Sequence, residues 1–188
     1  IWSSCAGIPL TVRSVMSSRG ADEEAEVFKE TCANHFDRSL AGDQLSPVRT
    51  SHQCWCSGNA CEAHEVTQTV AQRIANLTRS QVRYFEPFQV LKYEVGQFYK
   101  VHHDQNSGLF TPQGPRVYTF FMYLSTPEAG GGTRFANLEH VVPAVKGNAV
   151  LWPSIMNDDP TRDEPMTHHE ALPVMEGRKC ARLASNLA

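Results

Sequence analysis

The sequence predicts an α+β domain that is mainly β, in which helices near the N-terminus support a sandwich of short strands. Two observations predict this class. Apolar residues recur with helical spacing before Phe85 and with a spacing of two after it. Helices first and many strands afterwards indicate sheets that are backed by helices. With 188 residues, 41% of them hydrophobic, the chain suits one domain that buries roughly 70% of its unfolded surface.

Two segments have the pattern of amphipathic helices. Residues 21–40 begin with acidic side chains, which interact favourably with the positive end of a helix dipole. Residues 62–77 place apolar side chains along one side of a helix, at Val66, Val70, Ile74 and Leu77. Residues 41–62 are rich in Gly, Ser, Pro and Cys, which predicts a long loop with a short strand near residues 48–51.

Seven later segments have the composition of strands and are separated by turns that contain Gly, Pro or Asp. They are residues 88–93, 99–102, 116–124, 132–135, 140–142, 149–152 and 178–186. Trp152 is expected to be a core residue. Residues 42–61 and 105–115 have little apolar periodicity, which predicts mobile loops beside a binding site.

Charge and hydropathy exclude two classes of partner. The net charge of −3 argues against a nucleic-acid-binding protein, which usually carries a basic surface. No apolar run approaches the ~20 residues that span a bilayer, so we expect no membrane contact within this sequence. The sequence opens on Ile1 and not on methionine, and we expect any signal or anchor to lie outside it.

Six cysteines allow three interpretations. The even number favours three disulfides, whose pairing the sequence does not define, among Cys5, Cys32, Cys54, Cys56, Cys61 and Cys180. Buried free thiols are the second interpretation. The third is a zinc site formed by Cys54, Cys56, Cys61 and His64, although their spacing matches no common zinc module. Together with the glycosylation sequon that begins at Asn76, the cysteines favour an oxidising compartment.

A His-x-Asp pair lies in the expected strand at residues 99–102 and just beyond it. Side chains two residues apart in an extended strand point the same way, so His102 and Asp104 can reach one metal ion while His103 faces the opposite side. A second cluster, His168 and His169, follows much later in the sequence. One histidine from it would complete the two-histidine, one-carboxylate set that is typical of non-haem Fe(II) oxygenases.

Three motifs occur in the order in which the prolyl 4-hydroxylases carry them, over about residues 46–179. They are Tyr99-x-x-His102-x-Asp104, then Gly131-Gly132-Thr133, then His169-x-x-x-Pro173-Val174-x-x-Gly177-x-Lys179. The chain therefore resembles this branch of the 2-oxoglutarate-dependent dioxygenases. The resemblance implies a double-stranded β-helix, or jelly roll. It also implies one catalytic domain over residues 1–188, with residues 1–84 packing on a jelly-roll core formed by residues 85–188.

The resemblance also assigns roles to individual residues. It implies Fe(II) ligation by His102, Asp104 and His169, and it alone selects His169 over His168. It implies that Lys179 is a catalytic residue that pairs with the distal carboxylate of 2-oxoglutarate. The remaining roles are contacts to 2-oxoglutarate from Tyr93 and Thr133, and contacts to the peptide substrate from Arg116 and Glu86.

The activity implied by the family is hydroxylation of peptidyl proline to 4-hydroxyproline, with release of succinate and CO2. The implied cofactors are Fe(II), 2-oxoglutarate, O2 and L-ascorbate (vitamin C). The implied partner is a proline-containing protein or peptide. With the cysteines and the sequon, the implied location is the secretory pathway, in the lumen of the endoplasmic reticulum.

The sequence departs from the family pattern after Lys179. Family members usually continue with aromatic residues, including a tryptophan at the position that Ser185 occupies here. This difference leaves open an oxygenase that acts on a different residue or small molecule. A catalytically silent jelly-roll binding module is the alternative from another class. A zinc hydrolase is disfavoured because no general-base glutamate lies in a zinc-binding helix motif.

Overall fold

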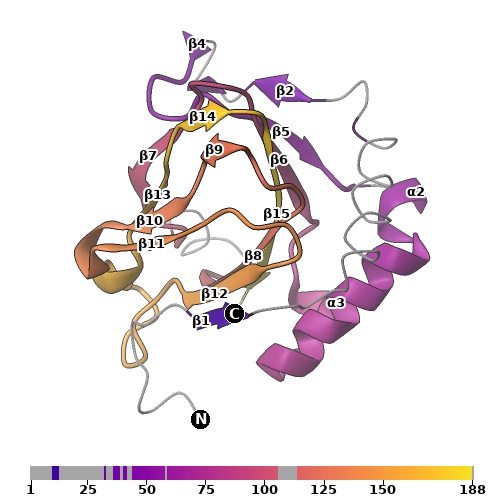
Figure 1. The fold of residues 1–188 in the computed structure, drawn as a ribbon. Helices are drawn as coiled ribbons and strands as arrows, with labels where there is room; N and C mark the ends of the chain where they lie inside the picture. Colours follow the sequence, from indigo (N-terminus) through magenta and orange to yellow (C-terminus); the bar gives the residue numbers. More distant parts are fainter. Residues whose placement is uncertain are drawn as a thin grey trace.

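Two antiparallel sheets face each other in the structure, a computed structural model that describes residues 10–12, 32, 36–38, 40–41, 44–57, 59–105 and 114–187 (Figure 1). In spatial order, the larger sheet contains β1 (Leu10–Val12), β12 (Ala149–Pro153), β8 (Arg116–Tyr123), β15 (Lys179–Leu187), β6 (Gln89–Tyr93), β5 (His52–Trp55) and β2 (Asp37–Arg38). The smaller sheet contains β11 (His140–Val142), β10 (Thr133–Phe135), β13 (His169–Ala171) and β7 (Tyr99–His102). This arrangement confirms the predicted jelly roll.

Shorter elements lie between the strands of the two sheets along the chain. The short strand β14 (Val174–Glu176) pairs with β9 (Ala129–Gly130), and β3 (Leu40–Ala41) pairs with β4 (Gln44–Leu45). Single 3-10 turns are formed by η1 (Val82–Tyr84), η2 (Ala136–Leu138) and η3 (Pro165–Thr167). None of the helices in the described residues is both long enough and apolar enough to cross a membrane.

The larger sheet is covered on its outer face by α3 (Glu65–Thr78), which follows the short helix α2 (Asn59–Glu62) (Figure 1). The Nδ1 atom of His64 accepts a hydrogen bond from the backbone N–H of Val66 and so caps the first turn. The apolar stripe predicted for this segment is buried at Val70 and Ile74, whereas Leu77 is exposed. The apolar side chains in the middle turns of α3 therefore pack the helix against the sheet.

Strand β8 separates two apolar layers because its side chains alternate. Phe120 and Met122 point towards α3 and join the cluster under the helix, whereas Phe121 and Tyr123 point into the space between the sheets. A strand that is buried on both faces is expected to be a continuous apolar run, and the second half of β8, residues 120–123, is such a run. The space between the sheets is therefore shielded from water on the helix side.

Most of the predicted strands are confirmed to within one residue at each end. The strand expected at residues 48–51 is wrong, because Arg49 makes only an isolated bridge to Tyr99 and the regular strand is β5. The expected loop at residues 42–61 is accordingly interrupted by β4, β5 and α2. Most of the helix expected at residues 21–40, and residues 106–113 of the other loop, lie outside the described residues. The last part of that helix is wrong, because β2 and β3 are strands.

One disulfide ties an earlier part of the chain to β5, and a second joins the residue that follows β5 to α2. Cys32 pairs with Cys54, and Cys56 pairs with Cys61. The zinc site considered for Cys54, Cys56 and Cys61 is therefore wrong, because a disulfide sulfur is not a thiolate ligand. Cys180 has a free, half-buried thiol, so the interpretation with three disulfides is wrong. Cys5 lies outside the described residues.

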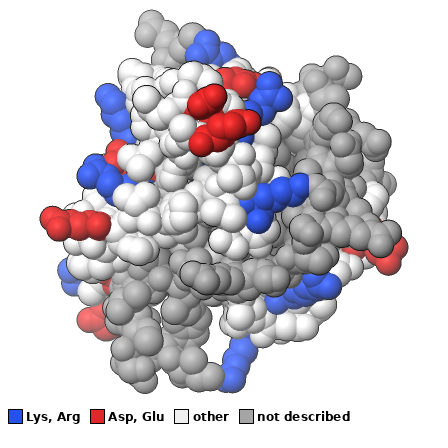
Figure 2. Space-filling view, viewed as in Figure 1, with Lys and Arg blue, Asp and Glu red and all other residues white. Residues whose placement is uncertain are grey.

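Exposed ion pairs contribute little to this fold. Basic and acidic side chains of the described residues are interspersed on the face shown in Figure 2. One such group joins Glu94 to Arg178 and to Lys92, with N–O distances of 3.0 and 3.6 Å. Pairs of this kind are worth at most about 1 kcal/mol each. The stability of the domain therefore depends mainly on its two apolar layers and its disulfides.

The two disulfides should differ in their effect on stability. They close loops with sequence separations of 22 and 5 residues. Loop entropy then gives about 3 kcal/mol for Cys32–Cys54 and about 2 kcal/mol for Cys56–Cys61. We expect the C32S/C54S variant to lose more free energy of unfolding in urea than the C56S/C61S variant. An equal loss, or the reverse order, would contradict this assignment.

Candidate active site

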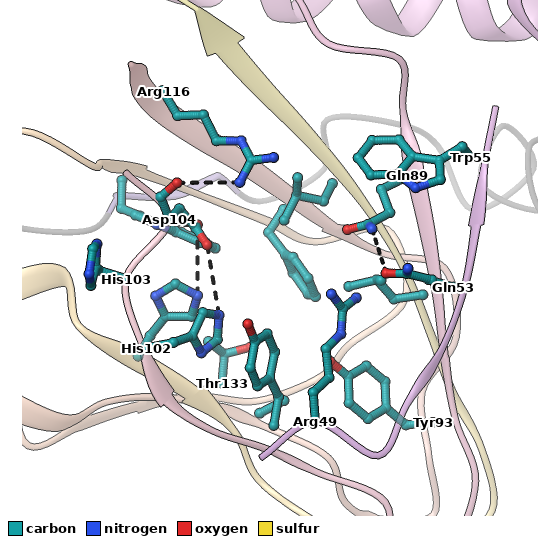
Figure 3. A pocket seen from close by; sticks show the side chains of 17 residues that line it. Arg49, Gln53, Trp55, Gln89, Tyr93, His102, His103, Asp104, Arg116 and Thr133 are labelled. Atoms are coloured by element: carbon teal, nitrogen blue, oxygen red, sulfur yellow. Dashed lines mark hydrogen bonds and ion pairs between the residues drawn. The ribbon is translucent and has the colours of Figure 1, made fainter. Parts of the chain in front are cut away.

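A cavity of about 280 Å³ opens between the two sheets (Figure 3). Its walls come from β5, β6, β8, β12 and β15 of the larger sheet and from β7, β10 and β13 of the smaller one. Among the described residues, it contains the one group of three side chains placed to hold a metal ion. The structure thus brings together at one place the motifs that are separate in the sequence.

Pairing of β13 with β7 positions the two histidines of this group. His169 and His102 are directly opposite each other in the register, with ring centroids 4.3 Å apart. The Nε2 atoms of His102 and His169 lie 3.7 and 3.8 Å from the two carboxylate oxygens of Asp104. All three ligand atoms lie within 4.8 Å of one another, a separation that one metal ion can bridge.

Backbone carbonyls select the tautomer of both histidines. The Nδ1 atom of His102 lies 2.8 Å from the carbonyl oxygen of Lys100, and that of His169 lies 2.9 Å from the carbonyl oxygen of Thr167. Since a carbonyl oxygen only accepts, each Nδ1 must carry the proton. Each Nε2 then has a free lone pair for a metal ion. Donation of the other ring N–H to a backbone carbonyl is the usual arrangement of metal-binding histidines.

Asp104 is held by two buried donors. Its Oδ2 atom accepts hydrogen bonds from the Thr119 hydroxyl at 2.8 Å and from the Trp152 indole N–H at 3.2 Å. Burial alone would raise the pKa of Asp104, but His169, His102 and the Thr119 hydrogen bond together lower it below its ordinary value. The carboxylate is therefore ionised, and its Oδ1 atom remains available to a metal.

Burial also favours the neutral imidazole of His102. Burial, followed by the proximity of His169, lowers the pKa of His102 to about 4. Its ring stacks on Tyr99, with centroids 3.6 Å apart, which fixes the plane of the imidazole. The ligand set that fits a divalent metal is thus two imidazoles and one carboxylate, and burial and charge favour the metal-binding forms of His102 and Asp104.

Lys179 contributes a buried ammonium group to the interior. The side chain is fully buried, and its Nζ atom has no hydrogen-bond partner among the described residues. The rings of Tyr93, Phe121 and Tyr123 surround the Nζ atom at 5.0, 5.4 and 5.6 Å. Burial lowers the pKa of Lys179 to about 7. An unpaired cation is costly in such surroundings, so this site fits an anionic ligand.

The two residues expected beside Lys179 lie close to it. Tyr93 is opposite Lys179 in the pairing of β6 with β15 and lines the cavity. Burial raises the pKa of the Tyr93 phenol, which therefore stays a neutral donor. Thr133 also lines the cavity, and its Oγ1 atom accepts a hydrogen bond from the Tyr123 hydroxyl at 2.8 Å. The Thr133 hydroxyl proton can then point to a ligand.

Arg116 and Glu86, expected at a peptide groove, form an ion pair with each other. The two N–O distances are 2.7 and 3.1 Å, as in a bidentate pair. Arg116 also donates to the backbone carbonyl of Asp104 at 3.3 Å and lines the cavity (Figure 3). The pair thus connects the cavity wall to the loop that carries Asp104.

The neighbouring histidines take no part in the three-residue cluster. His168 forms a hydrogen bond through Nε2 to Asp163, and its ring stacks on that of His103 with centroids 5.5 Å apart. Sequence alternation places His103 opposite to His102, yet His103 still borders the cavity. The register of β13 turns His169, and not His168, towards His102. The spacing of the residues in the sequence did not reveal this register.

Three residues of the site were missed by sequence reasoning. Thr119 and Trp152 both hold Asp104, although Trp152 was expected only as a core residue, which it also is. Arg49 lines the cavity with its guanidinium 5.0 Å from the centre of the Tyr99 ring. No local pattern marks Thr119 or Arg49, because their roles depend on which strands become neighbours.

Comparison with known proteins identifies the family. The model of the 2OG-Fe(II) oxygenase superfamily matches residues 88–187. Prolyl 4-hydroxylase subunit alpha-3 of Bos taurus is 33% identical over 170 residues, which cover 85% of this chain and 30% of that protein. Subunit alpha-2 of Caenorhabditis elegans is 30% identical, with 84% and 31% covered. The chain thus spans about a third of the length of these relatives.

Solved structures share the fold. The viral collagen prolyl hydroxylase vCPH of Paramecium Bursaria Chlorella virus-1, in its 2OG complex, matches with a TM-score of 0.75 and 23% identity over 96% of both chains. A Pseudomonas putida prolyl-4-hydroxylase matches with a TM-score of 0.69 and 17% identity over 100% of this chain and 96% of that one. The resemblance to prolyl 4-hydroxylases is confirmed, and the chain belongs to the 2OG-Fe(II) oxygenase superfamily.

Proposed function

We propose that this chain is a 2-oxoglutarate- and Fe(II)-dependent dioxygenase that hydroxylates peptidyl proline to 4-hydroxyproline. One molecule of O2 supplies one oxygen atom to the proline and one to succinate, and CO2 is released from 2-oxoglutarate. The observation that carries the proposal is the combination of a two-histidine, one-carboxylate cluster with a buried, unpartnered ammonium group in one interior. Bound Fe(II) would supply the oxygen-activating chemistry.

Three protein ligands would hold the iron. His102 and His169 would bind through Nε2, because their Nδ1 atoms are engaged with backbone carbonyls. Asp104 would bind through Oδ1, because Thr119 and Trp152 occupy its other oxygen. Fe(II) held by two histidines and one carboxylate would supply the chemistry by which 2-oxoglutarate oxygenases activate O2.

Lys179 would pair with the distal carboxylate of 2-oxoglutarate. Its Nζ atom is buried and free of other hydrogen-bond partners among the described residues, so a carboxylate would relieve the cost of an isolated charge. The Tyr93 ring lies 5.0 Å from Nζ, and Thr133 accepts a hydrogen bond from Tyr123, whose ring lies 5.6 Å from Nζ. The Thr133 and Tyr93 hydroxyls would therefore be placed to donate to the same group. The three aromatic rings around Nζ would exclude water from the pair.

A proline-containing peptide is the proposed substrate. The names of the relatives support a prolyl target, and one fold neighbour is a Trichoplax adhaerens prolyl hydroxylase in complex with a hypoxia inducible factor peptide fragment (TM-score 0.71, 18% identity, covering 99% of this chain and 86% of that one). Extended proline-rich segments are already ordered before binding and fit grooves lined with aromatic residues. The Arg116–Glu86 pair would order the wall of such a groove next to the iron.

The proposal also covers the cell compartment, the reductant for the iron and the extent of the catalytic unit. Two disulfides and the exposed Asn76 of the sequon support the secretory pathway, in the lumen of the endoplasmic reticulum. By analogy with the family, L-ascorbate would return oxidised iron to Fe(II). The strands β1, β2 and β5 complete the larger sheet, which supports one catalytic unit formed by residues 1–84 together with residues 85–188.

A second candidate is a 2-oxoglutarate oxygenase that acts on another residue or on a small molecule. The observation that favours it is Ser185, which is buried where the family usually has a tryptophan. Its neighbour on the same side of β15, Leu183, lines the cavity instead. The iron ligands and Lys179 would be the same in both candidates, so the substrate alone separates them.

Metal binding should depend on His169 and not on its neighbour. We expect His169→Ala to weaken binding of Mn(II), a redox-stable substitute for Fe(II), by more than about 100-fold in calorimetry. The matched control is His168→Ala, which removes a side chain bonded to Asp163 and should leave the affinity within a few fold. Equal losses in both variants would contradict the assigned ligand.

Lys179→Met should stabilise the ligand-free protein while weakening 2-oxoglutarate binding. The pKa of Lys179 falls to about 7 on folding, so the unfolded chain binds more protons between about pH 7 and 10. Wild-type stability should therefore rise with pH in that window, and the variant should lack this rise.

Thermal denaturation with Mn(II), with and without 2-oxoglutarate, measures both effects. We expect the variant to lose about 2–4 kcal/mol of 2-oxoglutarate binding, the scale of a buried charged pair. Equal stabilisation of wild type and variant by 2-oxoglutarate would be incompatible with the proposed role.

Mass spectrometry tests the reaction itself. Poly-proline, collagen-like and Ser-Pro-rich peptides are incubated side by side with the protein, Fe(II), 2-oxoglutarate and ascorbate. We expect a gain of one oxygen atom on proline in at least one peptide, matched by succinate. Succinate formation with oxygen on another residue would favour the second candidate. No turnover of 2-oxoglutarate by the iron-loaded protein would favour a silent binding module.

A further inference from the structure

Two glutamines on neighbouring strands form a hydrogen-bonded pair in the cavity wall. The Nε2 atom of Gln89 on β6 donates to the Oε1 atom of Gln53 on β5 at 2.8 Å (Figure 3). Both side chains line the cavity that contains the three-residue cluster. Gln89 is buried and Gln53 is half-buried. The pair therefore lies in the wall of the proposed active site and not on the outer surface.

This pairing leaves one whole carbonyl group and one whole NH2 group for a ligand. Each amide has a carbonyl oxygen and an NH2 group, and the bond between them uses one NH2 and one carbonyl. The Gln89 carbonyl and the Gln53 NH2 remain, without a hydrogen-bond partner among the described residues. Rotating both amides by 180° would exchange their roles, but the pair would still offer one carbonyl group and one NH2 group.

Trp55 borders the glutamine pair. It is opposite Gln89 in the pairing of β5 with β6, lines the same cavity and is 40% exposed. A large aromatic ring so exposed, beside a polar pair, is the combination that grooves for extended proline-rich peptides use. The ring offers a flat apolar surface for a proline ring, while polar neighbours bind the peptide backbone.

We propose that Gln53, Gln89 and Trp55 form a peptide subsite that requires one non-proline residue. The free carbonyl and NH2 of the glutamines would bind the backbone N–H and C=O of that residue, and an adjacent proline ring would pack on Trp55. Proline has no backbone N–H, so it can satisfy only half of the glutamine pair. The inference rests on the proposed function, because it assumes a proline-containing peptide substrate.

A scan of N-methylated peptides tests the subsite. The parent is a peptide of alternating proline and alanine, and each variant peptide carries one N-methylalanine, which removes a single N–H. For the wild type, we expect methylation at one position to raise both KM and the calorimetric Kd about tenfold, the scale of one buried hydrogen bond. Both Gln53→Leu and Gln89→Leu should weaken binding of the parent peptide. Gln89→Leu, which removes the carbonyl that accepts the peptide N–H, should also reduce the effect of methylation to within twofold.

Gln72→Leu is the matched control. Gln72 lies on the exposed side of α3 and is also paired with a side-chain amide, that of Asn76. This variant should keep wild-type KM and the full response to methylation. Trp55→Leu should raise KM for the proline-containing peptides and leave the response to methylation in place.

The outcomes separate the subsite from the reaction. Hydroxylation of the parent peptide with no sensitivity to methylation at any position would overturn the subsite alone. Sensitivity that persists in Gln89→Leu would also overturn it and would indicate a merely structural pair between β5 and β6. No oxygen transfer to, and no binding of, any proline-containing peptide by the wild type would overturn both the subsite and the proposed function.

Discussion

The site depends on the antiparallel pairing of β13 with β7. This register places His169 opposite His102, with Asp104 beyond the end of β7, so that three ligand atoms from distant parts of the sequence converge. A shift by one residue would turn His168 inwards and His169 outwards, because side chains alternate along a strand. The backbone carbonyls that accept from the two Nδ1 atoms belong to the same framework, so the fold sets position and tautomer together.

The interior sets a well-bonded carboxylate, Asp104, against an ammonium group, that of Lys179, which has no hydrogen-bond partner among the described residues. Asp104 is bound by Thr119 and Trp152, and its pKa is lowered by the two histidines. Lys179, in contrast, has an ammonium group without a hydrogen-bond partner among the described residues, in a setting that lowers its pKa to about 7. Such a group destabilises the ligand-free protein and favours the binding of an anion. Stability and ligand affinity are therefore linked through one side chain.

The sequence predicted the parts of this site that depend on local spacing. Alternation along a strand paired His102 with Asp104, and apolar periodicity predicted α3 and most of the strands. It did not predict contacts that form only when distant strands become neighbours. The choice of His169 came from the family motif. No pattern in the sequence indicated that Thr119 would donate a hydrogen bond to Asp104. The placement of Gln53 in the cavity wall was hidden because a strand was expected four residues too early.

Metal location by anomalous X-ray scattering tests the central claim most directly. Crystals would be grown with Mn(II) and 2-oxoglutarate, and data would be collected at the manganese absorption edge. The account predicts one anomalous peak within about 2.3 Å of Nε2 of His102, Nε2 of His169 and a carboxylate oxygen of Asp104. It also predicts that the far carboxylate of 2-oxoglutarate lies against Nζ of Lys179. A metal peak bound by His103 or His168, or a carboxylate far from Lys179, would contradict it.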